Sequence, residues 1–273
     1  MSARVAIAKG ERCHDTVERA VKLSGGVEHL EGKPVLIKVN FICTEKWDSG
    51  ATTDPLLVEA LIRMIEEVNP DIAVVESDAN MTNADKAAEA TGMLEMCERN
   101  GVPFKNLRKE SEKVELTCPT GKTFNSIKVP RIVAEGHIVD AAKLKTHETT
   151  GITLGMKNMF GLLPTKWKFR YHMRGIDRVI VDVNSALSPS LVVIDGFVGM
   201  EGGGPVGGDP VRMDLVIAGR DVVATDIVGA EVMGFDPAKI DHIRMAVEEG
   251  LGKWEREIVG ETIESVRRRF RPA

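Results

Sequence analysis

Cysteine is scarce in this chain of 273 residues, and long apolar runs are absent. The four cysteines, at positions 13, 43, 97 and 118, have no spacing typical of a zinc or iron–sulfur site. We therefore expect a reduced, cytoplasmic protein without a disulfide framework. The first residues lack the apolar segment of a signal peptide, and no apolar run approaches the ~20 residues of a membrane helix. These absences predict no membrane partner.

Aromatic residues and an excess of one charge are also lacking. Aromatic residues make up only 4% of the chain, so the core is expected to be mainly aliphatic. The 36 Lys and Arg against 41 Asp and Glu give a net charge of −5. This slight acidity argues against a nucleic-acid-binding protein, which needs a basic surface. The hydrophobic share of 43% and the charged share of 28% are typical of a globular protein.

Short runs rich in Val and Ile alternate with helical periods along the chain. Residues 34–39 (PVLIKV) and 71–76 (DIAVVE) are too uniformly apolar for strands with one exposed face. Asp54 followed by Pro55 predicts the start of a helix between them. The alternation predicts an α/β fold, with a mostly parallel sheet flanked by helices on both faces. Because no repeat or linker interrupts the chain, we expect a single domain over residues 1–273.

Two segments depart from the alternation. Residues 102–130 hold two short apolar runs on either side of a Pro-Thr-Gly turn at 119–121, which predicts an inserted β-hairpin. Residues 166–174 (KWKFRYHMR) alternate strictly between basic side chains and aromatic or apolar ones. This pattern fits a half-buried strand, a flap within 165–175 over a ligand, or a platform for single-stranded nucleic acid. The acidity of the chain favours the first two interpretations.

A glycine-rich segment lies between the predicted strands 191–194 and 213–218. Residues 200–208 contain five glycines and a proline, and they formally satisfy the GxGxxG pattern. No helix follows, as a dinucleotide site would require. Residues 120–123 (TGKT) likewise lack the first glycine of a phosphate-binding P-loop. Glycine lets the backbone approach a ligand closely, and successive N–H groups can bind an anion. The glycines predicted to bind a ligand are Gly202, Gly203 and Gly204.

Basic side chains are predicted to gather at one end of a strand. Lys143, Lys145 and His147 are two residues apart, so they share one face if the strand that starts near residue 138 continues. The alternative is an exposed strand end with solvated lysines. A further lysine and an asparagine occur inside the apolar run 152–164 (ITLGMKNMFGLLP), where free solvation is not expected. We therefore predict that this region binds a small anion. The predicted ligand-binding side chains are Lys38, Asn40, Lys143, Lys145, Lys157 and Asn158.

Two histidines and two carboxylates could supply chemistry to such a site. His147 and His172 are the candidate general acids and bases, because imidazole titrates near neutral pH. Asp195 and Glu201, which precede or begin the glycine-rich segment, could orient a histidine or bind a divalent metal ion. No local spacing specifies a metal or any other cofactor, so cofactor identity stays open at this point.

The motifs as a set resemble the signature of an uncharacterised family, domain of unknown function 362. The resemblance covers nearly the whole chain and implies a prokaryotic protein without an assigned activity. Some members carry a ferredoxin-like module, which implies a redox partner protein, but this chain lacks the cysteine cluster of that module. The matching segments are residues 36–40 (LIKVN), 52–55 (TTDP), 143–147 (KLKTH), 153–164 (TLGMKNMFGLLP), 171–172 (YH), 182–184 (DVN), 193–196 (VIDG), 200–205 (MEGGGP) and 224–226 (ATD).

The sequence as a whole favours an enzyme that binds a small anionic metabolite, phosphorylated or carboxylated, at the carboxyl ends of the strands. A divalent metal could assist. Two alternatives remain: a metal- or cofactor-handling protein without turnover, and a single-stranded nucleic-acid binder that uses residues 166–174 and the arginines of 267–271. The oligomeric state stays open.

Overall fold

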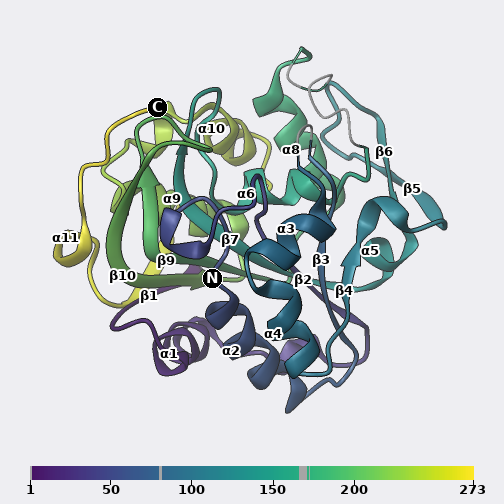
Figure 1. Ribbon diagram of the computed structural model, residues 1–273. Helices are drawn as coiled ribbons and strands as arrows, with labels where there is room; N and C mark the ends of the chain where they lie inside the picture. The colour runs from purple at the N-terminus through teal and green to yellow at the C-terminus, as the bar shows by residue number, and fades with distance from the viewer. Residues whose placement is uncertain (1, 80–81, 166–170, 172) are drawn as a thin grey trace.

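The backbone forms one mixed sheet and a separate two-stranded hairpin. The structure is a computed structural model that describes residues 2–79, 82–165, 171 and 173–273 (Figure 1). The strands of the sheet are β1 (Ala3–Lys9), β2 (Val35–Lys38), β3 (Ile72–Glu76), β4 (Phe104–Asn106), β7 (His137–His147), β8 (Gly151–Ile152), β9 (Leu191–Glu201), β10 (Asp209–Gly219) and β11 (Arg256–Gly260). The hairpin pairs β5 (Lys113–Thr117) with β6 (Ser126–Pro130).

The sheet has the strand order β11-β1-β10-β9-β7-β2-β3-β4, and the short β8 pairs with the end of β7. The strands from β9 to β4 are parallel to one another. In contrast, β10 runs antiparallel to both of its neighbours, β9 and β1. The predicted α/β fold with a mostly parallel sheet is confirmed.

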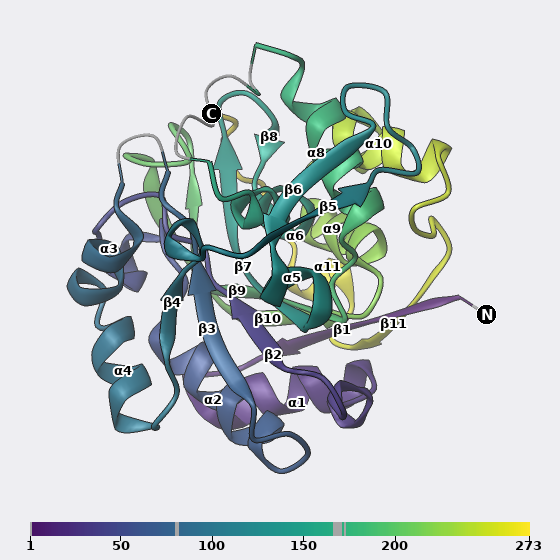
Figure 2. The same ribbon diagram turned by 90° about the vertical axis from the view of Figure 1, so that its right-hand side faces the viewer.

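Helices cover both faces of the sheet, as Figure 2 shows. Side chains alternate along the strands, so Val35 and Ile37 pack in one core while Leu36 packs in the other. One core is completed by α1 (His14–Ser24), α2 (Pro55–Glu66), α3 (Ala84–Ala90) and α4 (Met93–Arg99). The other is completed by α5 (Arg131–Glu135), α6 (Leu154–Met159), α8 (Ile176–Ala186), α9 (Val222–Val232), α10 (Asp241–Glu248) and α11 (Ile263–Val266).

Local signals explain where α2 begins. The Asp54 carboxylate accepts a hydrogen bond from the backbone N–H of Leu56, and Pro55 occupies the first helical position. Proline is suited to this position because its missing N–H would have no helical partner there. The predicted helix start is therefore confirmed, and it fixes the end of the long segment that follows β2.

The inserted hairpin is confirmed, and its turn is held by a carboxylate. The backbone N–H groups of Lys122, Thr123 and Phe124 donate to the side chain of Asp182 in α8, at N···O distances of 3.2, 2.9 and 3.0 Å. The segment that resembles the end of a P-loop therefore binds an anion that belongs to the protein itself. It joins two strands rather than opening a helix, which agrees with the rejection of a P-loop.

The glycine-rich segment lies between the two expected strands, but it is shorter than expected. The predicted strands 191–194 and 213–218 are both longer, because β9 and β10 contain 11 residues each and pair as a hairpin. Asp195 is consequently a residue within β9 and does not end a strand. The segment 202–208 forms the tip of this long hairpin. The sequence misplaced these boundaries because pairing with a neighbouring strand, rather than local composition, decides how far each strand runs.

Two further predictions concern the segment 166–174 and the absence of a membrane helix. The alternating segment 166–174 lies mostly outside them, so its prediction as a strand or a flap is untested. Within the described part of the chain, no helix has both the length and the apolar character needed to cross a bilayer.

Candidate functional site

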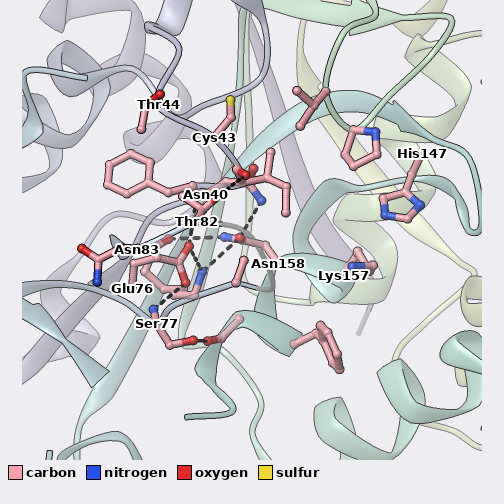
Figure 3. Close-up of a pocket in the computed structure, with 18 of the residues that line it drawn as sticks. Asn40, Cys43, Thr44, Glu76, Ser77, Thr82, Asn83, His147, Lys157 and Asn158 are labelled. Atoms are coloured by element: carbon pink, nitrogen blue, oxygen red, sulfur yellow. Dashed lines mark hydrogen bonds and ion pairs between the residues drawn. The ribbon is translucent and has the colours of Figure 1, made fainter. Parts of the chain in front are cut away.

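A cavity of about 860 Å³ opens at the carboxyl ends of three parallel strands. A volume of this size suits a small metabolite. The carboxyl edge of a parallel sheet is also where α/β folds commonly bind ligands. Five segments line the cavity (Figure 3). They are residues 38 and 40–44 at and after the end of β2, 76, 77, 79, 82, 83 and 86 at and after the end of β3, 147–149 at and after the end of β7, 157, 158, 160 and 161 in and after α6, and 205 and 206 of the hairpin tip.

The ammonium group of Lys38, a cavity-lining residue at the end of β2, is fully hydrogen-bonded within the protein. Its Nζ donates to Glu76 Oε2 at 2.8 Å, to the carbonyl of Val39 at 2.5 Å and to Asn158 Oδ1 at 3.2 Å. A lysine has only three protons to donate, so these partners use all of them. Glu76 also accepts from the backbone N–H groups of Phe41 and Ser77, at 3.1 and 2.8 Å. Lys38 therefore orients the strand ends, and the structure gives it no spare donor for a ligand.

Asn158 connects this ion pair to a second buried carboxylate. Its Nδ2 donates to Asp140 Oδ1 at 2.6 Å, and its Oδ1 accepts from Asn40 Nδ2 at 2.9 Å. Asp140 is completely buried, its Oδ2 has no hydrogen-bond partner among the described residues, and burial raises its pKa to about 7. Nearby Glu76 raises this pKa as well. Asp140 is thus a carboxyl group that holds a proton at mildly acidic pH.

The helix that carries Asn158 and Lys157 is fixed by another buried acid. Asp226 in α9 accepts hydrogen bonds from the backbone N–H groups of Gly155 and Met156, both at 2.8 Å. Burial raises the pKa of Asp226 well above its usual range, and the nearby Asp140 adds to this effect. A Cβ atom on Gly155 would lie 3.0 Å from an oxygen of each of these two carboxyl groups, so only glycine leaves room for both. Asp226 therefore anchors the start of α6.

Lys157 lies on the cavity wall without an acidic partner in the described part of the chain. Its Nζ lies over the ring of Phe160, 4.9 Å from the ring centre. Burial and, to a smaller extent, the neighbouring Lys38 ammonium lower the pKa of Lys157 to about 8. Asp177 and Glu76 have the opposite, smaller effect. Because a cation in this position gains little compensation from the protein, it favours an anionic ligand.

His147 ends β7 and lines the same cavity, on the side that also holds Lys157 in Figure 3. Its Nδ1 accepts from the backbone N–H groups of Thr149 and Thr150, at 3.1 and 3.4 Å. These two donors place the proton of the neutral imidazole on Nε2. The ring is therefore held in one tautomer and one orientation.

Lys143 and Asp195 form a separate, closed cluster. Lys143 Nζ donates to Asp195 Oδ2 at 2.7 Å, and both side chains are completely buried. The same oxygen accepts from the backbone N–H of Asp54 at 2.9 Å. The Asp54 carboxylate in turn binds Arg12 through two bonds of 2.5 and 2.7 Å. Lys143 and Asp195 are absent from the cavity lining, and their charges are balanced within the cluster.

Lys145 joins the hairpin tip to the segment before α2. Its buried Nζ donates to the carbonyl of Ala51 at 2.6 Å and to that of Pro205 at 3.4 Å. Burial lowers its pKa to about 7. Of the hairpin tip, Pro205 and Val206 reach the cavity, whereas the predicted glycines do not line it.

The glycines 202–204 help to attach the tip to β7. The backbone N–H of Glu148 donates to the carbonyl of Gly204 at 3.1 Å, and Thr146 Oγ1 donates to that of Gly202 at 3.0 Å. A Cβ on Gly204 would lie 2.1 Å from the carbonyl oxygen of Thr146, so this approach requires glycine. The geometry gives Gly202 and Gly204 this structural role, whereas a Cβ on Gly203 would have its nearest atom 3.8 Å away.

The sequence pattern of a family described as Domain of unknown function (DUF362) matches residues 35–231. The chain belongs to this family. The matched range includes every strand end that lines the cavity, and it confirms the resemblance found in the sequence. The chain is also 29% identical over 228 residues to the thylakoid-associated protein sll1697 of Synechocystis sp.. This alignment covers 81% of the chain and 68% of that relative.

Asp195 and Glu201 were predicted to bind a metal ion in this DUF362 chain. Among the described residues, the fold does not bring them together with other metal-ligating side chains. The Glu201 carboxylate accepts two hydrogen bonds from Arg271, one from its backbone N–H at 3.0 Å and one from its side-chain Nε at 3.1 Å. These bonds lower the pKa of Glu201. Within the described ranges, no cluster of three or more His, Cys, Asp or Glu side chains could hold a metal ion. His172 lies outside the described residues.

Several cavity residues escaped the sequence analysis. Glu76 ends an otherwise apolar strand, and a carboxylate in that position is a signal that could have been used. Cys43, to which the sequence analysis assigned no binding role, is half-buried and lines the cavity. Phe41, Lys86 and Phe160 give no local signal, because only the fold brings them to one cavity.

Proposed function

We propose that this protein is an enzyme that binds a small anionic metabolite, phosphorylated or carboxylated, in the cavity at the carboxyl ends of β2, β3 and β7. The observation that carries the proposal is the position of Lys157. Its ammonium group lies on the wall of a metabolite-sized cavity and has no acidic partner among the described residues. An anionic ligand would supply the missing charge.

The other cavity residues divide into two roles in this proposal. His147, held in one tautomer, acts as the proton donor or acceptor next to the bound anion. Asn40 lies next to the ligand and is oriented by Asn158. Lys38 and Glu76 act as positioning residues, because their mutual ion pair and hydrogen bonds are already complete. A divalent metal is not needed for binding in this scheme.

Titration calorimetry with inorganic phosphate and with acetate tests the binding step. We expect the Lys157→Met variant to lose at least about tenfold in affinity for the anion that binds, which corresponds to about 1.4 kcal/mol. The control is Lys128→Met, which removes an exposed lysine on β6 outside the cavity. Unchanged affinity in Lys157→Met would contradict the proposal, as would an equal loss in the control.

Turnover can be tested without a known substrate. A mixture of phosphorylated and carboxylated metabolites is incubated with the wild type and with the His147→Gln variant, and each compound is then quantified by mass spectrometry. We expect at least one anionic compound to be consumed by the wild type and spared by the variant. Consumption of none would favour a binding protein without turnover.

The cytoplasmic location is also a proposal. The name of the cyanobacterial relative associates that protein with thylakoids. We infer that this chain stays in the cytoplasm. The described residues include no helix that could cross a bilayer, and the chain has a net charge of −5. Cell fractionation with detection of the native chain tests this, and recovery mainly with membranes would contradict it.

A further inference from the structure

Aromatic side chains are few in this chain, and a large share of them surrounds the cavity. The chain has eight Phe, three Trp and one Tyr. Phe41 and Phe160 line the cavity directly, and each is only 4% exposed. Three further aromatic residues stand behind them. They are Phe104, Phe124 and Tyr171.

The two lining rings are held by contacts with those neighbours. Phe41 packs on Phe104 with ring centres 6.3 Å apart. Phe160 packs edge-to-face on Tyr171 at 5.4 Å, and Tyr171 packs in the same way on Phe124 at 5.4 Å. Such pairs favour fixed relative orientations of the rings. The cavity therefore has rigid aromatic surfaces rather than adaptable aliphatic ones at these two places.

The rest of the cavity lining has an apolar region next to the charged side chain of Lys157. Ile42, Ala79, Pro205 and Val206 contribute carbon surface to the same cavity. The Lys157 ammonium is directly adjacent to the Phe160 ring, at 4.9 Å from its centre. A ligand that neutralises this cation is thus brought against an aromatic surface. A compact anion such as free phosphate would leave most of the 860 Å³ unfilled.

We propose that the cavity binds an anion that carries a planar aromatic ring, an aryl carboxylate or an aryl phosphate. This inference rests on the proposed function, because it assigns the body of the ligand whose anionic group binds at Lys157. The ring packs against Phe160, which is adjacent to Lys157, and the anionic group lies beside Lys157 and His147. Both aryl classes share this chemistry, so the experiment includes one probe of each.

Titration calorimetry on the full chain compares matched probes. Benzoate is compared with cyclohexanecarboxylate and acetate, and phenyl phosphate is compared with inorganic phosphate. We expect at least one aryl probe to bind about tenfold or more tightly than its compact counterpart. We also expect benzoate to bind at least about threefold more tightly than cyclohexanecarboxylate if the carboxylate series binds, since aromatic pairs gain beyond their buried area.

Three variants locate the effect. Phe160→Leu and Phe160→Met are each expected to lower the affinity for the aryl probe by about three- to tenfold, with little change for the compact anion. Phe235→Leu, which changes a half-buried phenylalanine outside the cavity, is the control and should change neither. Thermal unfolding checks that each variant is folded. If Phe160→Leu does not fold, Phe160→Met still decides the question.

The possible failures are distinct. Equal affinity for aryl and compact anions in the wild type would overturn the aromatic inference and leave the proposed function intact. Equal affinity for benzoate and cyclohexanecarboxylate would also overturn it, since it would show a requirement for bulk alone. Absence of binding by every anionic probe to folded protein would overturn both proposals.

Discussion

Lys143 and Lys157 are both lysines in apolar surroundings near the carboxyl edge of the sheet, yet their electrostatic environments are opposite. Lys143 is completely buried and forms an ion pair of 2.7 Å with Asp195, which is also completely buried. Lys157 is partly exposed on a cavity wall, and within the described residues its near neighbour is an aromatic ring rather than a carboxylate. The described residues therefore supply a carboxylate partner for Lys143 but none for Lys157.

The difference separates a lysine that stabilises the fold from one suited to a ligand. A buried ion pair adds little stability compared with apolar side chains of the same shape, but removing one partner leaves the other charge uncompensated. A lysine without a partner weakens the fold slightly and gains from a bound anion. Stability and binding measurements on the two lysines should therefore give opposite results.

The largest expected effect is on Lys143. The Lys143→Met variant leaves the buried Asp195 carboxylate without its cation, so we expect a loss of about 3–5 kcal/mol in the free energy of unfolding. Guanidinium denaturation measures this loss. The double variant Lys143→Met with Asp195→Leu should recover much of it, because the uncompensated charge is removed. If Lys143→Met alone is as stable as the wild type, Lys143 does not stabilise the fold and does not differ from Lys157 in this respect.

A pH-dependent effect follows from Asp140. Burial raises its pKa from 3.8 to about 7, so between these values the folded chain holds a proton that the unfolded chain has lost. Its contribution to stability is present below about pH 4 and is lost as the pH rises toward 7. From pH 5 to pH 7 the wild type should lose about 2 kcal/mol more than Asp140→Asn. Asp71→Asn, at an exposed position, is the control for denaturation at both pH values.

A smaller effect is expected where the backbone approaches Lys38. A Cβ atom on Gly161 would lie 2.5 Å from Lys38 Nζ and 2.9 Å from Glu76 Oε1. Gly161→Ala should therefore disturb this ion pair and cost about 1–3 kcal/mol in unfolding free energy. Gly203→Ala is the matched control, because the nearest atom to its Cβ would lie 3.8 Å away. Equal stability of the two variants would show that Lys38 can move without cost.

The smallest effect is expected on Lys157. Lys157→Met removes a desolvated cation that has no acidic partner, so the free energy of unfolding should change by less than about 0.5 kcal/mol or increase. The same denaturation series as for Lys143→Met measures it. A loss of several kcal/mol would show that Lys157 stabilises the fold, and it would weaken its assignment to a ligand.

The layers of the fold could be predicted because their signals are local. Apolar strands such as 34–39 and the Asp54-Pro55 helix start follow from composition and capping. The position of β10 between β1 and β9, antiparallel to both, could not be predicted. It depends on pairings between segments separated by about 200 residues, which no local pattern encodes.

Part of the candidate site could be predicted from the sequence, because several of its side chains follow the ends of predicted strands. Lys38, Asn40, His147, Lys157 and Asn158 do line one cavity. Lys143 was grouped with them because it shares its spacing along β7, yet its charge is satisfied by an acid of the neighbouring strand. Sequence spacing places side chains on one face of a strand, but it does not reveal which cations already have a partner.

The β9–β10 tip has a consequence for how this site can diversify. Its outer residues, Pro205 and Val206, form part of the cavity rim, whereas its base is attached to β7 through Gly202 and Gly204. Substitutions at the two rim positions therefore reshape the entrance without disturbing the strand ladder beneath. Exchanging these two side chains would therefore change which ligands fit the cavity, while the base of the tip stays attached to β7.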